Sequence, residues 1–155
     1  MTSKKATRGK ASGATARPPK NPPKSPRPPQ SAAVEDYLET ILQLIDTKGY
    51  ARVIDIAAGL GISQASVTNM VQRMDAGGLL KYEKYRGLTL TAEGRRLGEN
   101  ITHRHSVLTE FLRMLGLPED IVYRDVEGME HHISPTTVAA LVRLNAHLKS
   151  SRYRP

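Results

Sequence analysis

A helix–glycine turn–helix pattern constrains the fold of this chain more than any other feature. It occupies residues 52–80, which read RVIDIAAGLGISQASVTNMVQRMDAGGLL. We predict one short helix near 53–60, a turn at Gly61, whose lack of a side chain suits positive φ, and a second helix at about 63–75 capped by Ser63. Two helices joined by a tight turn, the second with a polar face, are typical of a helix-turn-helix motif that binds DNA.

The segments on either side extend this motif. Residues 34–49 repeat apolar side chains at helical intervals and end at a glycine, which predicts an amphipathic helix. Residues 79–91, LLKYEKYRGLTLT, alternate apolar and polar side chains around a turn near Gly87, which predicts a β-hairpin. Three helices followed by a hairpin form a winged helix-turn-helix, and the hairpin loop would carry Lys84 and Arg86 to the DNA backbone.

The rest of the chain predicts helices. Apolar residues recur at helical intervals between a Thr91 cap and Gly116, which indicates one long helix. Two shorter helices follow near 118–131 and 135–148, each entered at a proline. The fold class predicted is therefore mostly α, with a winged helix-turn-helix DNA-binding domain followed by an all-helical domain.

The net charge of +8 belongs to the N-terminal tail. Residues 1–31 contain eight Lys and Arg, no acid and seven of the ten prolines, so the remaining 15 basic and 15 acidic residues balance in 32–155. A segment this poor in large apolar side chains is expected to be disordered. It is either a solubilising leader or a non-specific electrostatic arm for DNA phosphates.

Composition excludes several other classes of protein. The chain has no cysteine, which excludes disulfides, thiolate metal ligands and thiol catalysis. It has no run of about 18 to 20 apolar residues that would span a bilayer, and no apolar segment follows the basic N-terminus as in a secretory signal. We therefore expect a cytoplasmic protein with no membrane partner.

Double-stranded DNA is the expected partner of the second helix of the motif. Amides on such a helix can pair with adenine in the major groove, and hydroxyl groups can contact either bases or phosphates. Which residue contacts a base stays open, as does the alternative of a winged helix used only for protein–protein contacts. The candidate DNA-binding residues are Ser63, Gln64, Ser66, Thr68, Asn69, Gln72 and Arg73 of the helix, with Lys84 and Arg86 of the hairpin loop.

A second candidate site lies in residues 125–134, DVEGMEHHIS. On an α-helix with about 100° per residue, Glu127, Glu130 and His131 share one arc of about 100°, and His132 falls outside it. Val126, Met129 and Ile133 fall together on another side, where they would form the buried stripe. The arc is either a set of metal ligands or a solvated helix face.

Further candidate ligands occur on two other predicted helices. Asp36 and Glu39 are spaced i, i+3 on the first helix, and His105 lies near the edge of the apolar stripe of the long helix. Imidazole and carboxylate together suit manganese, iron(II), cobalt or zinc, and an oxygen-dominated set without sulfur favours manganese. Each group alone is equally compatible with a structural role, because three separate helices must converge to make one site.

The ordered motifs resemble a known family. Taken in order, EDYLETI, KGYARVIDIAAGLGISQASVTNMVQRM, YEKYRGLTLTAEG, HRHSVLTEFLRMLG and DVEGMEHHIS resemble the iron- and manganese-dependent repressors of the diphtheria toxin repressor family, over residues 34–148. The iron-responsive branch has methionine where Asp36 lies and cysteine where Glu127 lies. The chain therefore resembles the manganese branch more closely.

The resemblance implies a homodimer in which manganese activates a repressor of manganese uptake genes, bound to a palindromic operator. It implies a DNA-binding domain over 32–98, and a metal-binding and dimerisation domain over 99–150. One or two Mn²⁺ ions per subunit are expected, and Fe²⁺, Co²⁺, Zn²⁺ or Cd²⁺ can substitute. The ligands that the resemblance implies are Asp36, Glu39, His105, Glu127, Glu130 and His131.

Two rival interpretations differ in class. The first is a winged-helix regulator that responds to iron or zinc, or to no metal at all. In a metal-independent regulator, the acid and histidine cluster would be structural. The second is a metalloenzyme, which nothing supports beyond the ligands, because the HExxH order, a nucleophile elbow and a phosphate loop are missing from the sequence. We therefore expect no catalytic activity and no small-molecule substrate.

Overall fold

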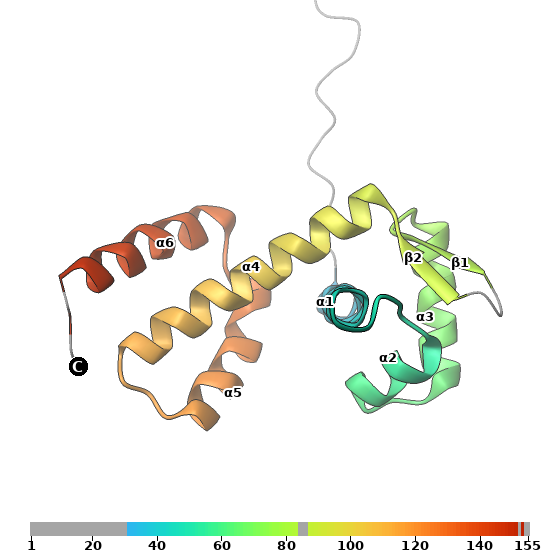
Figure 1. Cartoon of the computed structure of the whole chain (residues 1–155), viewed down its shortest axis with the longest axis horizontal. Coiled ribbons are helices and arrows are strands. Elements are labelled where there is room, and N and C mark those ends of the chain that lie inside the picture. The colour runs from blue at the N-terminus through green and yellow to red at the C-terminus, as the bar shows by residue number, and fades with distance from the viewer. Residues whose placement is uncertain (1–30, 84–86, 152, 154–155) are drawn as a thin grey trace, which may run out of the picture.

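The computed structural model describes residues 31–83, 87–151 and 153, in which helices dominate and a single two-stranded sheet forms the wing (Figure 1). The predicted disordered tail lies outside the described residues. None of the described helices is both long and apolar enough to cross a membrane. The elements are α1 Ala32–Lys48, α2 Val53–Leu60, α3 Gln64–Ala76, β1 Leu80–Glu83, β2 Gly87–Leu90, α4 Ala92–Met114, α5 Glu119–Met129, the 3₁₀ helix η1 Glu130–His132 and α6 Pro135–Ser150.

The helix-turn-helix prediction is confirmed in its local details. Helix α2 ends at Gly61, whose φ of 66° is accessible to glycine at little cost. The Ser63 hydroxyl accepts the Ser66 N–H at 3.2 Å and so caps α3. Val67, Val71 and Met74 bury the other face of α3, which leaves its polar residues directed outward.

The predicted hairpin is the wing of the fold. Strands β1 and β2 pair antiparallel, with Leu80 opposite Leu90 and Glu83 opposite Gly87. An isolated bridge between Ala51 and Leu88 ties the wing to the segment that enters α2. Lys84 and Arg86 fall outside the described residues, so their predicted contact with DNA stays a prediction.

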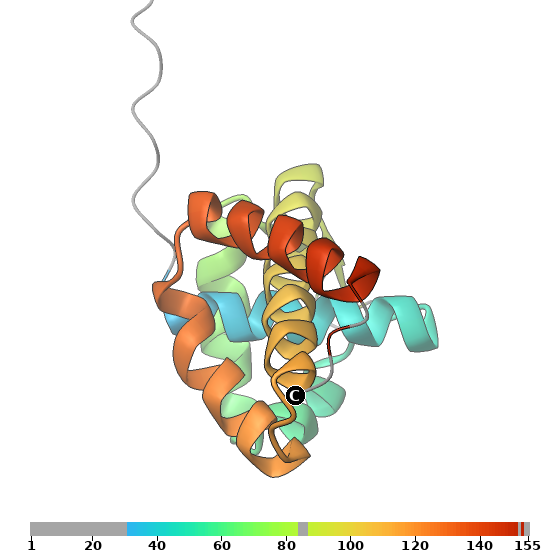
Figure 2. The ribbon, with the colours of Figure 1, turned by 90° about the vertical axis from the view of Figure 1, so that its left-hand side faces the viewer.

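Helix α4 connects the two halves of the molecule. Its N-terminal part packs against α1, and its C-terminal part lies between α5 and α6, which flank it from below and above in the view of Figure 1 (Figures 1 and 2). Gly94 allows the close approach to the wing, because a Cβ there would lie 1.8 Å from the carbonyl oxygen of Leu79. The predicted boundary between residues 98 and 99 falls inside this helix, which continues unbroken to Met114.

The buried apolar residues form two separate clusters. The larger lies among α1, α2, α3, the wing and the start of α4, and includes Leu38, Ile41 and Ile56, which are fully buried. The smaller lies between α4 and α5 and consists of Leu108, Leu112, Val122 and Val126. Each half of the molecule thus has its own core, and the polar cluster described below lies where α1, α4 and η1 meet.

The end of α5 departs from the prediction of one continuous helix over 118–131. The α-helix begins after Pro118, ends at Met129 and continues as one turn of 3₁₀ helix. Because a 3₁₀ turn advances about 120° per residue, the arc calculated for an α-helix does not hold there. Met129, predicted in the buried stripe, is instead 39% exposed, and Glu130 is only 1% exposed.

Candidate metal centre

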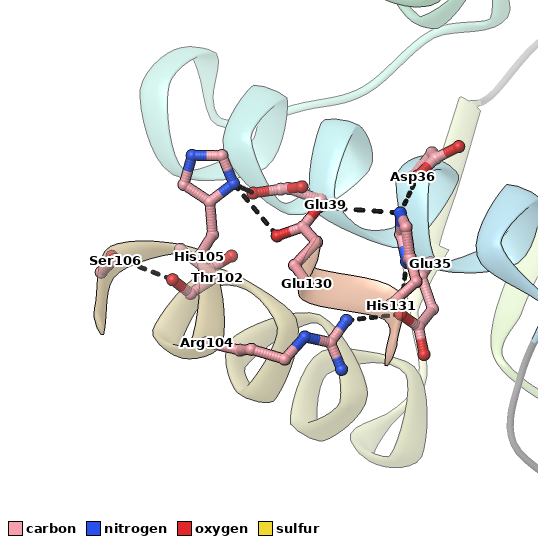
Figure 3. Close-up of polar contacts among 9 residues, drawn as sticks. All are labelled: Glu35, Asp36, Glu39, Thr102, Arg104, His105, Ser106, Glu130 and His131. Atoms are coloured by element: carbon pink, nitrogen blue, oxygen red, sulfur yellow. Dashed lines mark hydrogen bonds and ion pairs between the residues drawn. The ribbon is translucent and has the colours of Figure 1, made fainter. Parts of the chain in front are cut away.

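Three ligand-type side chains from three elements converge between the two cores (Figure 3). Glu39 of α1, His105 of α4 and Glu130 of η1 each offer one ligand atom, and these atoms lie within 4.8 Å of one another. The His105 Nδ1 atom is 3.1 Å from Glu130 Oε2 and 3.7 Å from Glu39 Oε1. Residues predicted from separate segments of the sequence therefore meet at one point.

His131 extends this cluster on the other side of Glu130 (Figure 3). Its Nε2 atom lies 3.2 Å from Asp36 Oδ1 and 3.7 Å from Glu130 Oε1. Glu127 lines the same groove as Asp36, Glu39 and His105, at its exposed side. Four of the six predicted ligands thus line one groove, and direct contacts join the other two to them, Glu130 to His105 and His131 to Asp36.

The electrostatics of the cluster favour a bound cation. Burial raises the pKa of the Glu39 and Glu127 carboxyl groups, and the negative charge of Glu130 raises both further. Burial also raises the pKa of Asp36, although the His131 charge opposes that effect. These pKa values stay raised although the charges of His105 and His131 oppose the shift, so the carboxyl groups lack sufficient counter-charge, and a divalent cation would provide it.

The two histidines respond to the same negative field. The hydrogen bond with Glu130 raises the pKa of His105 against the opposing effect of burial. Burial lowers the pKa of His131, but the Glu35 hydrogen bond and the Asp36 charge outweigh it, so the net shift is upward. In the absence of a metal, a proton on each imidazole would supply part of the positive charge that the site lacks.

The donor set fits a divalent metal ion. One carboxylate oxygen, Glu130 Oε1, is buried and has no hydrogen-bond partner within the described part of the chain. A buried, unpaired carboxylate oxygen is rare unless an ion or water satisfies it. The surrounding donors are carboxylate oxygens and imidazole nitrogens, a set suited to manganese, iron(II), cobalt or zinc.

The structure reveals two polar residues that the sequence prediction missed. The Arg104 guanidinium donates to Glu35 Oε2, and the same oxygen lies 2.8 Å from His131 Nδ1. Each neighbours a predicted ligand in sequence, Arg104 beside His105 and Glu35 beside Asp36, but adjacency alone does not indicate a contact. The other histidine of the motif, His132, is exposed, as predicted for a residue outside the ligand arc.

The candidate DNA-binding residues of α3 lie on the face opposite the core. Ser63, at the cap, and most of the polar residues of the helix are exposed. Thr68 is only half-buried, and its hydroxyl donates to the Gln64 carbonyl at 2.9 Å. The exposed residues available to a nucleic acid are Ser63, Gln64, Ser66, Asn69, Gln72 and Arg73.

Comparison with known families identifies the class of protein. Residues 31–88 match the model of the iron dependent repressor N-terminal DNA binding domain. Residues 91–154 match the iron dependent repressor metal binding and dimerisation domain. The chain therefore belongs to the iron-dependent repressor family, that of the diphtheria toxin repressor, whose members are transcriptional regulators and not enzymes.

Individual relatives agree with this assignment. The chain is 54% identical over 102 residues to the HTH-type transcriptional regulator MntR of Geobacillus kaustophilus, covering 66% of this chain and 72% of the relative. It is 51% identical over 112 residues to the MntR of Lysinibacillus sphaericus, covering 72% and 81%. The solved structure of the manganese regulator SloR superposes with a TM-score of 0.63 at 27% identity, covering 72% of this chain and 52% of that one.

These matches establish the general activity. The chain is a metal-activated, DNA-binding transcriptional repressor similar to the MntR regulators. Its N-terminal half binds DNA, and its C-terminal half binds metal and joins two copies into a homodimer.

Proposed function

We propose that this protein represses manganese uptake genes when Mn²⁺ occupies the groove between its two cores. The observation that carries the proposal is the convergence of Glu39, His105 and the buried Glu130 from three elements, with one Glu130 oxygen left without a hydrogen-bond partner. The proposed ligands are Asp36, Glu39, His105, Glu127, Glu130 and His131.

The chemistry of the donor atoms favours manganese over the softer metals. Four of the six proposed ligands are carboxylates, and the chain has no cysteine that would favour iron(II) or zinc. The iron-responsive relatives resemble this chain in the rest of the pattern, but they carry sulfur-containing residues at the positions of Asp36 and Glu127. Glu130 contacts both histidines, so a cation beside His105 and another beside His131 would share it, which is compatible with one or two ions.

Metal binding would order the two halves relative to each other. Asp36 and Glu39 project from α1, whose opposite face includes Leu38 and Ile41 of the DNA-binding core. Glu130 and His131 belong to η1, at the end of the helix that packs in the second core. A bound cation supplies positive charge to both sets of carboxylates, so it links the DNA-binding half to the dimerisation half.

This linkage makes metal and DNA binding reciprocal. If one arrangement of the two DNA-binding halves fits the operator and the same arrangement completes the metal site, each ligand must tighten the binding of the other by the same factor. A homodimer would present two copies of α3, which suits a palindromic operator with half-sites about one helical turn apart. The exposed α3 residues, with Lys84 and Arg86, are the proposed contacts.

The decisive measurement is operator affinity as a function of metal at fixed salt, because salt alone changes protein–DNA affinity strongly. Fluorescence anisotropy on DNA from upstream of a manganese uptake gene should show tight binding with Mn²⁺ and weak binding in chelator. Parallel titrations with Fe²⁺, Co²⁺, Zn²⁺ and Cd²⁺ test the choice of metal. Equal affinity in manganese and in chelator would contradict the proposal.

Two variants separate the metal site from its surroundings. Glu130→Ala should abolish the response to manganese, because it removes the carboxylate that contacts both histidines. His132→Ala is the matched control, since His132 is exposed and adjacent in sequence. If Glu130→Ala keeps full manganese-dependent DNA binding, the cluster is structural, and the metal-independent regulator is the better interpretation.

A further inference from the structure

We propose that Glu35 and Arg104 are positioning residues that hold His131 so that its Nε2 atom faces the metal ligands. This inference rests on the proposed manganese site. Neither residue would touch the ion, and both would act through the imidazole ring of His131.

The geometry places a carboxylate, a guanidinium and an imidazole in one chain of contacts (Figure 3). Glu35 Oε2 lies 2.8 Å from His131 Nδ1, and the same oxygen accepts a hydrogen bond from Arg104 Nη2. The three side chains are only 14–16% exposed, so water screens these contacts little. They come from η1, α1 and α4, three of the four elements that supply the proposed ligands.

The two nitrogens of His131 have different surroundings. Nδ1 faces Glu35, whose contacting oxygen is already held by Arg104. Nε2 faces Asp36 at 3.2 Å and the unpaired Glu130 Oε1 at 3.7 Å. A neutral imidazole keeps one proton and offers one lone pair, and a carboxylate can only accept a hydrogen bond. Both nitrogens face carboxylates, but the contact of Nδ1 with Glu35 is the shorter, at 2.8 Å against 3.2 Å for Nε2 with Asp36. We therefore assign the proton of the neutral ring to Nδ1, which leaves the Nε2 lone pair for the metal.

Such an arrangement does two things for a ligand histidine. A carboxylate that accepts the distal N–H fixes the orientation of the ring and makes the ligating nitrogen a stronger donor. Arg104 in turn fixes the carboxylate through a charge-assisted hydrogen bond. Because Arg104 neutralises Glu35, this fifth acid adds no net charge to the proposed ligand set and is not free to bind the ion itself.

Arg104 also ties α1 to α4 across 69 positions of the sequence. A purely structural interpretation would assign the Arg104–Glu35 pair to this connection alone and give it no part in metal binding. The two interpretations differ in what they predict for the ring of His131 and for manganese affinity, which can both be measured.

The test compares Glu35→Gln and Glu35→Ala with a matched control, Glu119→Ala. Glu119 forms an arginine–carboxylate pair with Arg113, with N–O distances of 2.8 and 2.7 Å, on the exposed surface at the start of α5, the opposite end of that helix from Glu127. Mn²⁺ affinity by calorimetry should fall by about 10- to 100-fold in Glu35→Ala, as for the loss of other outer-shell partners of metal-binding histidines. Glu35→Gln should fall less, and the control should match wild type.

A second measurement follows the ring directly and needs no metal. Two-bond ¹H–¹⁵N spectra of the neutral His131 imidazole should place the proton on Nδ1 in the metal-free wild type and in Glu119→Ala. Glu35→Ala should shift the population toward the other tautomer. Arg104→Lys keeps a positive charge beside Glu35, so it should retain more of the manganese affinity than Arg104→Met.

The outcomes distinguish the inference from the function on which it rests. Failure of wild type to bind Mn²⁺ would contradict the proposed function, while the tautomer would still decide whether Glu35 positions His131. Wild-type affinity in folded Glu35→Ala, with only a lower melting temperature, would overturn the inference and leave the pair structural. If Glu35→Ala does not fold, Glu35→Gln and Arg104→Lys decide by the same criteria.

Discussion

The DNA-binding half and the metal-binding half of this protein are stabilised in different ways. The first buries a large apolar cluster that draws on three helices, the wing and the start of α4. The second has a cluster of only four buried apolar residues between α4 and α5, and Val107 and Val138 are buried outside that cluster. Both of the buried polar residues that the described chain contains, Glu130 and Asn145, lie in this half. It also exposes Leu115, Val142 and Leu144, each about 40%, before any dimer forms.

This difference in stabilisation indicates how metal can control the protein. A half with a large core of its own folds without help, because burial of apolar surface supplies most of the stabilisation. A half with a small core and a buried acid gains more from any partner that binds only its folded form. We therefore expect the DNA-binding half to persist without metal and the metal-binding half to be ordered by manganese and by dimerisation.

The largest effect should come from the apolar core of the DNA-binding half. Ile56→Ala removes a fully buried side chain and should lower the free energy of unfolding by about 2–5 kcal/mol. Ile54→Ala on the same helix is the control, because Ile54 is 59% exposed and should change stability by less than about 0.5 kcal/mol. Urea unfolding monitored by circular dichroism measures both, and equal losses would contradict the description of this core.

Manganese should stabilise the two halves unequally. At a free concentration of 100 times Kd, the ion should add about 2.7 kcal/mol to the free energy of unfolding. Hydrogen exchange should show the largest gain in protection in α5 and η1, which carry Glu127, Glu130 and His131, and a smaller gain in α2 and α3. Uniform protection would mean that the two halves unfold as one unit and do not differ in how strongly manganese stabilises them.

The α3 cap should have a smaller, local effect. Ser63→Ala removes the hydroxyl that accepts the Ser66 N–H, and the loss should be about 1 kcal/mol of stability. Manganese affinity should not change, because Ser63 caps α3, a helix that carries none of the proposed ligands. Operator affinity should fall, since Ser63 is also a proposed DNA contact. Thermal unfolding and calorimetry with Mn²⁺ separate these effects, and a change in metal affinity would contradict a local role for the cap.

The pH dependence should reverse when manganese is bound. The pKa values of Glu39 and Glu127 are raised by burial and those of His105 and His131 are raised by acidic neighbours, so the folded apo state binds protons more tightly than the unfolded state. These groups therefore destabilise the apo protein as pH rises from the carboxyl range near 4.5 into the imidazole range above 6.5.

With manganese the sign changes, because the ligands must lose their protons before the ion can bind. Stability in saturating Mn²⁺ should therefore rise over the same pH range. Urea unfolding at about pH 5 and about pH 8, with and without the ion, measures both signs. If the stability of the apo protein is constant or rises in this pH window, the acids and histidines of the cluster do not bind protons more tightly in the folded state than in the unfolded state.

The sequence by itself determined the local structure of this protein. The helix-turn-helix with its Ser63 cap and Gly61 turn, the wing and the long helix were all predictable, because caps and periodicity depend on residues close together in the chain. The ligand set stays a prediction. The family resemblance supplied the grouping of the ligands, which periodicity alone left open.

Only the tertiary structure decided how the site is built. Glu130 becomes buried because α5 changes to a 3₁₀ turn at that residue, a change that the α-helical period does not predict. Arg104 and His131 meet at Glu35 across separations of 69 and 96 residues. Such contacts depend on how α1, α4 and η1 pack together, and no spacing within a single helix encodes that arrangement.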